Sequence, residues 1–160
     1  MELTRANRAL LVTARRATLV TIAPDGRPRP VPCCFALGVE DGRVVIDTPI
    51  DAKPKASHDP MALARVRDIR RDARVSLLVD HWDEDWARLA WLRVEGDARL
   101  LLPWAERDAT AHAAAVRALR TRYPQYVGQR LEGLPIIRIA PGRVTGWAAA
   151  AADGHDPAGR

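Results

Sequence analysis

Three prolines at alternate positions, Pro28, Pro30 and Pro32, restrict the fold of this chain more than any other feature. In a β-strand, residues of one parity point their backbone N–H groups toward the same side, and proline has no N–H to donate. One side of this strand therefore cannot be fully paired, so we expect it at the edge of a sheet. That edge is either a solvated border that prevents aggregation or the place where a flat ligand lies.

Strand and helix patterns alternate along the rest of the chain. Residues 17–23 and an apolar strand that continues to residue 37 flank the turn sequence Pro24-Asp25-Gly26, which predicts a β-hairpin. The other expected strands are 43–47, 75–79, 88–102 with a bulge or bend at Gly96, 135–139 and 144–149, and the expected helices are 2–14, 60–71 and 104–123. Short hairpins favour antiparallel pairing, so this order indicates an α+β protein built on an antiparallel barrel with about three helices.

Length and composition are those of one globular domain. The 160 residues are 48% hydrophobic and 28% charged, which predicts a single core within residues 1–150. The tail 151–160 has no periodicity, and we expect it to be disordered. No apolar run approaches the roughly 20 residues that span a bilayer, and the N-terminal residues mix charged with apolar side chains throughout. We therefore expect a cytoplasmic protein without membrane attachment.

The cysteines and histidines indicate packing instead of chemistry. Cys33 and Cys34 are adjacent in an expected strand, so their side chains point to opposite faces, which favours buried thiols over a disulfide or a metal site. No two of the four histidines have metal-ligand spacing, and His112 falls on the apolar stripe of a helix. The sequence therefore predicts no metal site, and His112 is expected in the core or in a dimer contact.

Positive charge is concentrated between residues 53 and 74. This segment has seven Lys or Arg residues against three Asp residues, which gives it +4 of the net charge of +5. Such a local excess is either an ordinary solvated face or an anion site. A pI near 10 permits nucleic acid, a membrane surface or a small polyanion as the partner. Because the chain has no zinc-finger spacing, no single-strand-binding aromatic motif and no basic tail, the small anion is favoured.

Several segments in a fixed order resemble the pyridoxamine 5'-phosphate oxidase-like family of FMN-binding split barrels. The segments are ATLVTIAPDGRPRPVPCCFAL, VVIDTPIDAKPK, IRRDARVSLLVD and WLRVEGDARLL. The block DIRRDARVSLLVDHWDEDW and the closing RVTGW resemble the deazaflavin branch of that family, the F420-dependent oxidoreductases. The resemblance implies a split β-barrel of six to eight strands, a homodimer, and two flavin-type cofactors in grooves between the subunits.

The resemblance also implies a cofactor site. Its residues are Pro30, Val31, Pro32, Cys33, Thr48, Lys53, Lys55, Arg67, Arg70 and Trp91. In this assignment the strand 30–34 lies against the ring, Thr48 and the two lysines hold the phosphate, and the helix arginines reach the carboxylates of a polyglutamate tail. The cofactor carries out the hydride transfer, so no residue of the chain is assigned a catalytic role.

Two points remain open in this assignment. The FMN enzymes of the family have an adjacent Arg-Lys pair where this chain has Lys53-Pro54-Lys55, which favours the deazaflavin F420 over FMN. Alternatives on the same barrel are an FMN-dependent oxidoreductase and a non-catalytic carrier of flavin or haem.

Residues 81–86 carry three carboxylates, which form either an acidic site or, as we expect, a turn. We predict that His81 and Trp82 border the substrate pocket.

Overall fold

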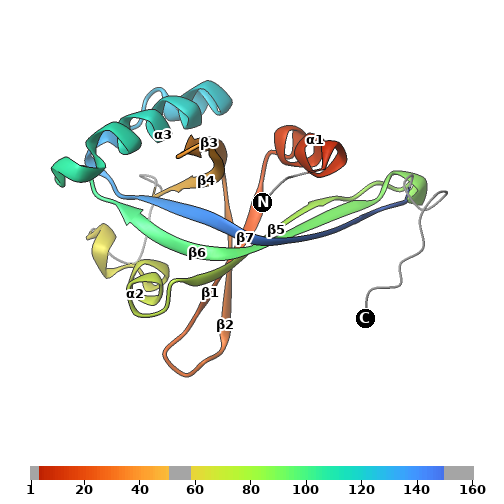
Figure 1. The fold of residues 1–160 in the computed structure, drawn as a ribbon, viewed down its shortest axis with the longest axis horizontal. Coiled ribbons are helices and arrows are strands. Elements are labelled where there is room, and N and C mark those ends of the chain that lie inside the picture. The colour runs from red at the N-terminus through yellow and green to blue at the C-terminus, as the bar shows by residue number, and fades with distance from the viewer. Residues whose placement is uncertain (1–3, 51–58, 150–160) are drawn as a thin grey trace.

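Seven strands form one antiparallel sheet in the computed structural model, which describes residues 4–50 and 59–149. Their order along the sheet is β2-β1-β5-β6-β7-β4-β3. The strands are β1 (Ala17–Ile22), β2 (Pro28–Cys33), β3 (Ala36–Glu40), β4 (Arg43–Pro49), β5 (Arg74–His81), β6 (Ala90–Leu101) and β7 (Ile136–Ala148). The helices are α1 (Arg5–Thr13), α2 (Ala64–Arg71) and α3 (Ala109–Arg122), as Figure 1 shows.

The chain itself brings the two ends of this sheet together. β2 and β3 stand at opposite ends of the strand order, yet only Cys34 and Phe35 separate them in sequence. A link of this length reaches roughly 10 Å, so the sheet has to curl until its edges approach each other. Within the described residues the two edge strands do not pair with each other, which leaves the barrel split. The expected α+β split barrel with three helices is confirmed.

The expected continuous strand from the prolines to residue 37 is wrong, because the chain breaks at Phe35. This side chain is fully buried, and the backbone of Phe35 bonds to a tyrosine instead of a neighbouring strand. The Phe35 N–H donates to the Tyr123 hydroxyl at 3.1 Å, and that hydroxyl lies 2.9 Å from the Phe35 carbonyl oxygen. Tyr123 closes α3, so a distant helix end determines where the strand stops.

The expected separation of strands 135–139 and 144–149 is also wrong, since β7 runs through Pro141 and Gly142 without interruption. Gly96 pairs with Pro141 and Glu95 pairs with Arg143, so β7 has one extra residue, Gly142, opposite the step from Glu95 to Gly96. A β-bulge accommodates one additional residue and bends the strand. An irregularity therefore lies at Gly96, as predicted, but the extra residue of the bulge belongs to β7, and Pro141 and Gly142 do not end that strand.

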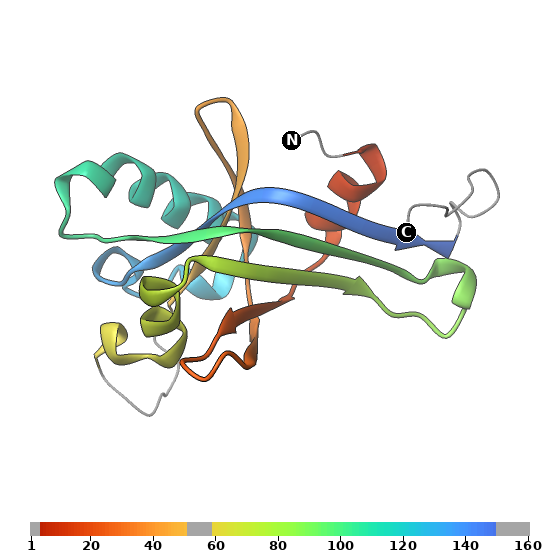
Figure 2. The ribbon, with the colours of Figure 1, turned by 60° about the horizontal axis from the view of Figure 1, so that its bottom comes forward.

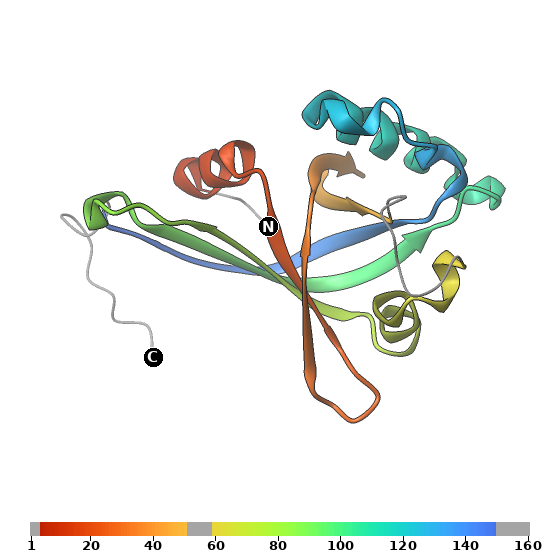
Figure 3. The same cartoon turned by 180° about the vertical axis from the view of Figure 1, so that it is seen from behind.

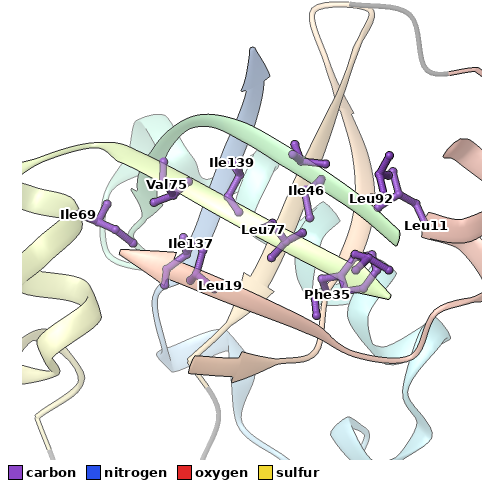
Figure 4. Packing of buried hydrophobic residues seen from close by; sticks show 14 of the residues in the cluster. Leu11, Leu19, Phe35, Ile46, Ile69, Val75, Leu77, Leu92, Ile137 and Ile139 are labelled. Carbon is purple, nitrogen blue, oxygen red and sulfur yellow. The ribbon is translucent and has the colours of Figure 1, made fainter. Parts of the chain in front are cut away.

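Alternate strand residues fill the barrel interior, as the period of two requires. On β1, Leu19 is fully buried while Thr18 and Val20 are half-buried on the opposite face. Figure 4 shows side chains from five strands converging in one cluster, with Phe35 near one end and Ile69 of α2 at the other. Each fully buried aliphatic side chain of this kind contributes about 1.5–3 kcal/mol.

A second cluster lies between α3 and the ends of β3, β6 and β7, where α3 covers the barrel (Figure 2). His112, Val116 and Leu119 of α3 are buried, and His112 Nε2 lies 2.8 Å from the Leu134 carbonyl oxygen. The packing role expected for His112 is confirmed. Among the described residues, no helix is long and apolar enough to cross a membrane.

The expected helices 104–123 and 60–71 both differ from the structure at their N-terminal ends. α3 begins at Ala109 instead of residue 104, because the Asp108 carboxylate accepts the Leu102 N–H at 3.0 Å and a short 3-10 turn intervenes. The expected helix 60–71 is a 3-10 turn followed by α2, with Asp59 capping the turn through a 2.8 Å bond from the Met61 N–H. Seen from behind, α2 lies beside the β1–β2 hairpin, while β5, β6 and β7 extend away as a three-stranded arm (Figure 3).

The bulge generates a stability prediction. A Cβ at Gly96 would lie 2.2 Å from the Ala140 carbonyl oxygen, whereas a Cβ at Gly128 meets no atom within 4 Å. We expect Gly96→Ala to lower the free energy of unfolding by about 2 kcal/mol or more, because the two strand backbones must move apart. Gly128→Ala is the matched control and should change it by less than about 0.5 kcal/mol. Equal urea midpoints for the two variants would contradict the bulge.

Candidate functional site

The proline strand lies at the edge of the sheet, as predicted, and its two faces differ. Pro28, Pro30 and Pro32 are exposed on the outer face, while Arg29, Val31 and Cys33 are half-buried on the inner one. Because proline has no N–H, the hydrogen-bonded pairs with β1 are those of the three inner residues. The free edge therefore offers the carbonyl oxygens of the prolines and no N–H donor from them, which suits a flat ligand that donates hydrogen bonds.

Thr48 and Cys33 join the end of β4 to this strand across the split. The Thr48 hydroxyl hydrogen-bonds to the Cys33 thiol, and burial raises the pKa of that thiol in spite of the bond. Thr48 is 1% exposed, so its side chain is already engaged in the interior. The structure thus brings the proline strand next to the end of β4. Lys53 and Lys55, the cations predicted in that loop, lie outside the described residues.

Buried ion pairs fix the end of β4. Arg138 is 4% exposed, and its Nε and Nη2 donate to the two carboxylate oxygens of Asp47 at 2.8 and 2.9 Å. Its Nη1 and the Nη2 of Arg99 both donate to Oε1 of Glu40, at 2.8 and 2.7 Å. Asp47 precedes Thr48, so this network holds the backbone from which the predicted phosphate loop begins. The hydrogen bond from Arg138 also lowers the pKa of Glu40.

A cavity of about 390 Å³ lies between the β1–β2 hairpin and α2, around the buried carboxylate of Asp68. Asp68 accepts hydrogen bonds from Thr21 Oγ1 at 2.8 Å and from Arg29 Nη1 at 2.6 Å. Arg71 Nη1 lies 3.6 Å from the same carboxylate, and Arg67 also lines the cavity. Three guanidinium groups therefore face one carboxylate, and the excess positive charge fits an anionic group.

The structure separates the two arginines that were predicted to act together. Arg67 faces the Asp68 cavity, whereas Arg70 lines a different cavity with Arg99 and Arg107. Arg67 makes no ion pair with any residue in the described part of the chain. One residue of the Asp68 cavity, Arg29, was not predicted as a site residue from the sequence. It stands between Pro28 and Pro30, and side chains alternate between the two faces of a strand, so Arg29 must point to the face opposite the prolines. This alternation could have identified it.

Trp91 is distant from the proline strand within one chain. β1 and β5 lie between β2 and β6, so the two strands are roughly 14 Å apart at the usual strand spacing. Trp91 pairs with Trp147 on the three-stranded arm, and these side chains are 36% and 45% exposed. A single chain therefore does not place Trp91 beside a ring on the free edge of β2.

His81 and Trp82 lie at the end of the same arm. Their side chains are exposed, and His81 Nε2 lies 3.7 Å from Asp83. Asp83 accepts the Asp85 N–H at 2.9 Å, and Arg88 forms ion pairs with both carboxylates. The interpretation of residues 81–86 as a turn is confirmed, and the described residues contain no cluster of His, Cys, Asp or Glu that could hold a metal.

Comparisons with known proteins agree with this architecture. The family described as "Pyridoxamine 5'-phosphate oxidase" matches residues 3–148. A conserved hypothetical protein from Mycobacterium tuberculosis is 23% identical, with a TM-score of 0.68 over 100% of this chain and 94% of its own.

Two further solved structures carry functional names. A haem storage protein from Vibrio cholerae is 13% identical, with a TM-score of 0.62 over 92% of this chain and 95% of its own. A structure named F420 reductase is 19% identical, with a TM-score of 0.61 over 89% of this chain and 98% of its own. At these identities the structural neighbours share the fold alone, and curated proteins give no match.

The network at the end of β4 predicts a pH dependence. Arg138 lowers the pKa of Glu40 below its ordinary value of 4.5, so ionised Glu40 stabilises the fold above that pH and loses this effect as the pH falls through its folded pKa. We expect Glu40→Gln to cost about 1 kcal/mol at pH 7, and to cost progressively less below pH 4.5. Urea unfolding from pH 3 to pH 7 measures this difference. A difference that is constant across the range would contradict the assignment.

Proposed function

Since this chain belongs to the pyridoxamine 5'-phosphate oxidase family, we propose that it is an oxidoreductase that uses the deazaflavin coenzyme F420 to pass a hydride to a small organic acceptor. The observation that carries this proposal is the Asp68 cavity, with its three arginines around one carboxylate. A cofactor with a tail of carboxylates fits this excess of cations better than one with a single phosphate, because each carboxylate can pair with a guanidinium. The similarity to a structure named F420 reductase supports the same choice.

Three groups of residues in this chain would bind the ring, the phosphate and the tail of such a cofactor. The ring lies along the free edge of β2, against Pro30, Val31, Pro32 and Cys33, where carbonyl oxygens accept hydrogen bonds from it. Lys53 and Lys55 follow β4 and hold the phosphate, and the tail continues to Arg67. Bound in this way, the reduced deazaflavin supplies the hydride, while the chain supplies position and excludes water.

We also propose that two copies of the chain complete the site. The arm exposes Trp82, Trp86, Trp91 and Trp147, and a group of exposed aromatic side chains of this size is typical of an interaction surface. In one chain Trp91 lies three strands away from β2, so it reaches a ring on that edge only if it comes from the other copy. The groove for the cofactor then lies between subunits, and Arg70 stays outside it.

The proposed cofactor site predicts different affinities for two flavins. Arg67→Ala should weaken the binding of F420 about tenfold, because a charge-assisted hydrogen bond contributes about 1.5 kcal/mol or more. The same change should leave FMN binding within twofold, since FMN has no carboxylate tail. Replacing Lys53 and Lys55 together by Ala should weaken both ligands. Equilibrium fluorescence titration with each cofactor measures these affinities.

The matched control is Arg117→Ala, which removes an exposed arginine of α3 far from the cavity. It should leave both affinities unchanged. Tighter binding of FMN than of F420 by the wild-type protein would indicate an FMN enzyme, and binding without reoxidation by any acceptor would indicate a carrier. An equal loss for Arg67→Ala and Arg117→Ala would show that only net charge matters.

The proposed dimer predicts a mass of twice 17.6 kDa in solution. Trp91→Glu with Trp147→Glu should reduce the mass to that of one chain, because the paired carboxylates cannot be buried without partners. Trp104→Glu is the control, since Trp104 is 61% exposed but lies before α3 and not on the arm. Sedimentation equilibrium distinguishes these outcomes. A monomeric wild-type protein, or a dimer in both variants, would contradict the use of this surface.

A further inference from the structure

A cavity of about 500 Å³ that the proposed cofactor site does not use lies on the outer face of the sheet, opposite the barrel interior. One row of cross-strand pairs crosses it, in which Val20 pairs with Ser76, Ser76 with Glu95, and Glu95 with Arg143. Paired residues share a face of the sheet, so these side chains line one continuous surface. Ile22 extends the apolar side of that surface along β1.

Two glycines account for the hollow. Gly96 and Gly142 line the cavity where β7 bulges opposite β6, and neither has a side chain to fill it. An added Cβ at Gly96 would collide with the opposite strand, whereas one at Gly142 would have only the Glu95 carbonyl oxygen nearby, at 3.6 Å. The close approach of the two strand backbones therefore requires glycine at position 96. At position 142 a side chain could be accommodated, so Gly142 leaves open space in the cavity.

The charges at the rim of the cavity neutralise one another. Arg74 makes two hydrogen bonds to Asp72, at 2.9 and 2.7 Å, and also attracts Asp97. Glu95 lies 3.7 Å from Arg93 and 4.0 Å from Arg143. A charged ligand would have to break one of these ion pairs, because the charged side chains at the rim are already paired with one another. The cavity therefore favours an uncharged molecule that contacts the apolar side chains of β1 and β5.

The position of the cavity connects it with the proline strand. Val20 pairs with Pro30 and Ile22 pairs with Pro28, so the apolar wall stands one strand away from β2. One strand spacing is roughly 4.8 Å, which is less than the width of an aromatic ring system. Pro28 and Pro30 are exposed on the same face as this wall, so a ring that extends from the edge of β2 over these prolines lies beside a molecule in the cavity.

We propose that this cavity binds an uncharged, mainly apolar molecule about as large as a bicyclic aromatic ring, and that this molecule is the hydride acceptor. The volume lies within the range of small-molecule sites. The role as acceptor rests on the proposed function, whereas the binding of an uncharged molecule does not. In the reaction, an unsaturated bond of the acceptor gains a hydride from the reduced cofactor and a proton from water, so one double bond becomes a single bond.

Three probes of equal size test the binding preference: 2-naphthol is uncharged, 2-naphthoate is an anion, and 2-naphthylmethylamine is a cation at pH 7. Fluorescence titration of the wild-type protein should give a dissociation constant for 2-naphthol at least tenfold lower than for either charged probe. Absence of saturable 2-naphthol binding, or equal affinity for a charged probe, would overturn the proposal.

Variants at Ser76 locate the bound probe. Ser76→Trp fills the cavity and should weaken 2-naphthol at least tenfold, whereas Ser76→Ala keeps the cavity open and should bind within twofold of wild type. If Ser76→Trp does not fold, Gly142→Phe with Gly142→Ala as its control makes the same comparison. Binding that is unaffected by the filling variants contradicts the cavity as the site.

Two further measurements separate this inference from the proposed function. F420 affinity of the Ser76 variants is measured without acceptor and should stay within threefold of wild type. Loss of F420 binding in the wild-type protein, with 2-naphthol still bound, rejects the cofactor and the acceptor role but keeps the cavity as a site. If Ser76→Trp instead converts a dimer into a monomer, the cavity is a subunit contact and the inference is wrong.

Discussion

The hydroxyl of Tyr123 determines the shape of this protein more than any other single group. It accepts the N–H of Phe35 and lies within hydrogen-bonding distance of the carbonyl oxygen of the same residue, at the point where the chain passes from one end of the sheet order to the other. Arg122 packs over the Phe35 ring 4.6 Å from its centroid, which adds a cation–π contact to the same junction. With this residue fixed, β2 and β4 approach across the split, and Thr48 of β4 lies beside Cys33 of β2.

Short sequence motifs predicted correctly those elements whose structure depends on neighbouring residues in the chain. Alternating prolines placed β2 at an edge, and Pro24-Asp25-Gly26 predicted the hairpin, because both depend on a few adjacent residues. The break at Phe35 and the continuity of β7 depend on residues far along the chain, Tyr123 and Gly96. Proline and glycine in β7 predict a turn unless the pairing with β6, which leaves Gly142 as a bulge, is known.

The candidate site shows the same division. The sequence predicted that the proline strand is free on one side and that cations follow the third expected strand. The structure confirms the free edge and places Thr48, near the end of β4, beside Cys33, while the cations Lys53 and Lys55 lie outside the described residues. It did not predict which helix arginines share a cavity. Residues four apart on a helix are displaced by about 40° and residues three apart by about 60° in the other direction. Arg71 therefore joins Arg67 at Asp68, and Arg70 turns toward a different surface.

The carboxylate of Asp68 has a consequence for the protein before any ligand arrives. Because it already pairs with Arg29 and lies near Arg71, the guanidinium groups do not stand against one another unscreened in the empty cavity. Folding consequently does not have to wait for an anion to relieve their repulsion. The arginines of this cavity can therefore take their positions before the ligand binds, and the ligand meets cations that are already in place.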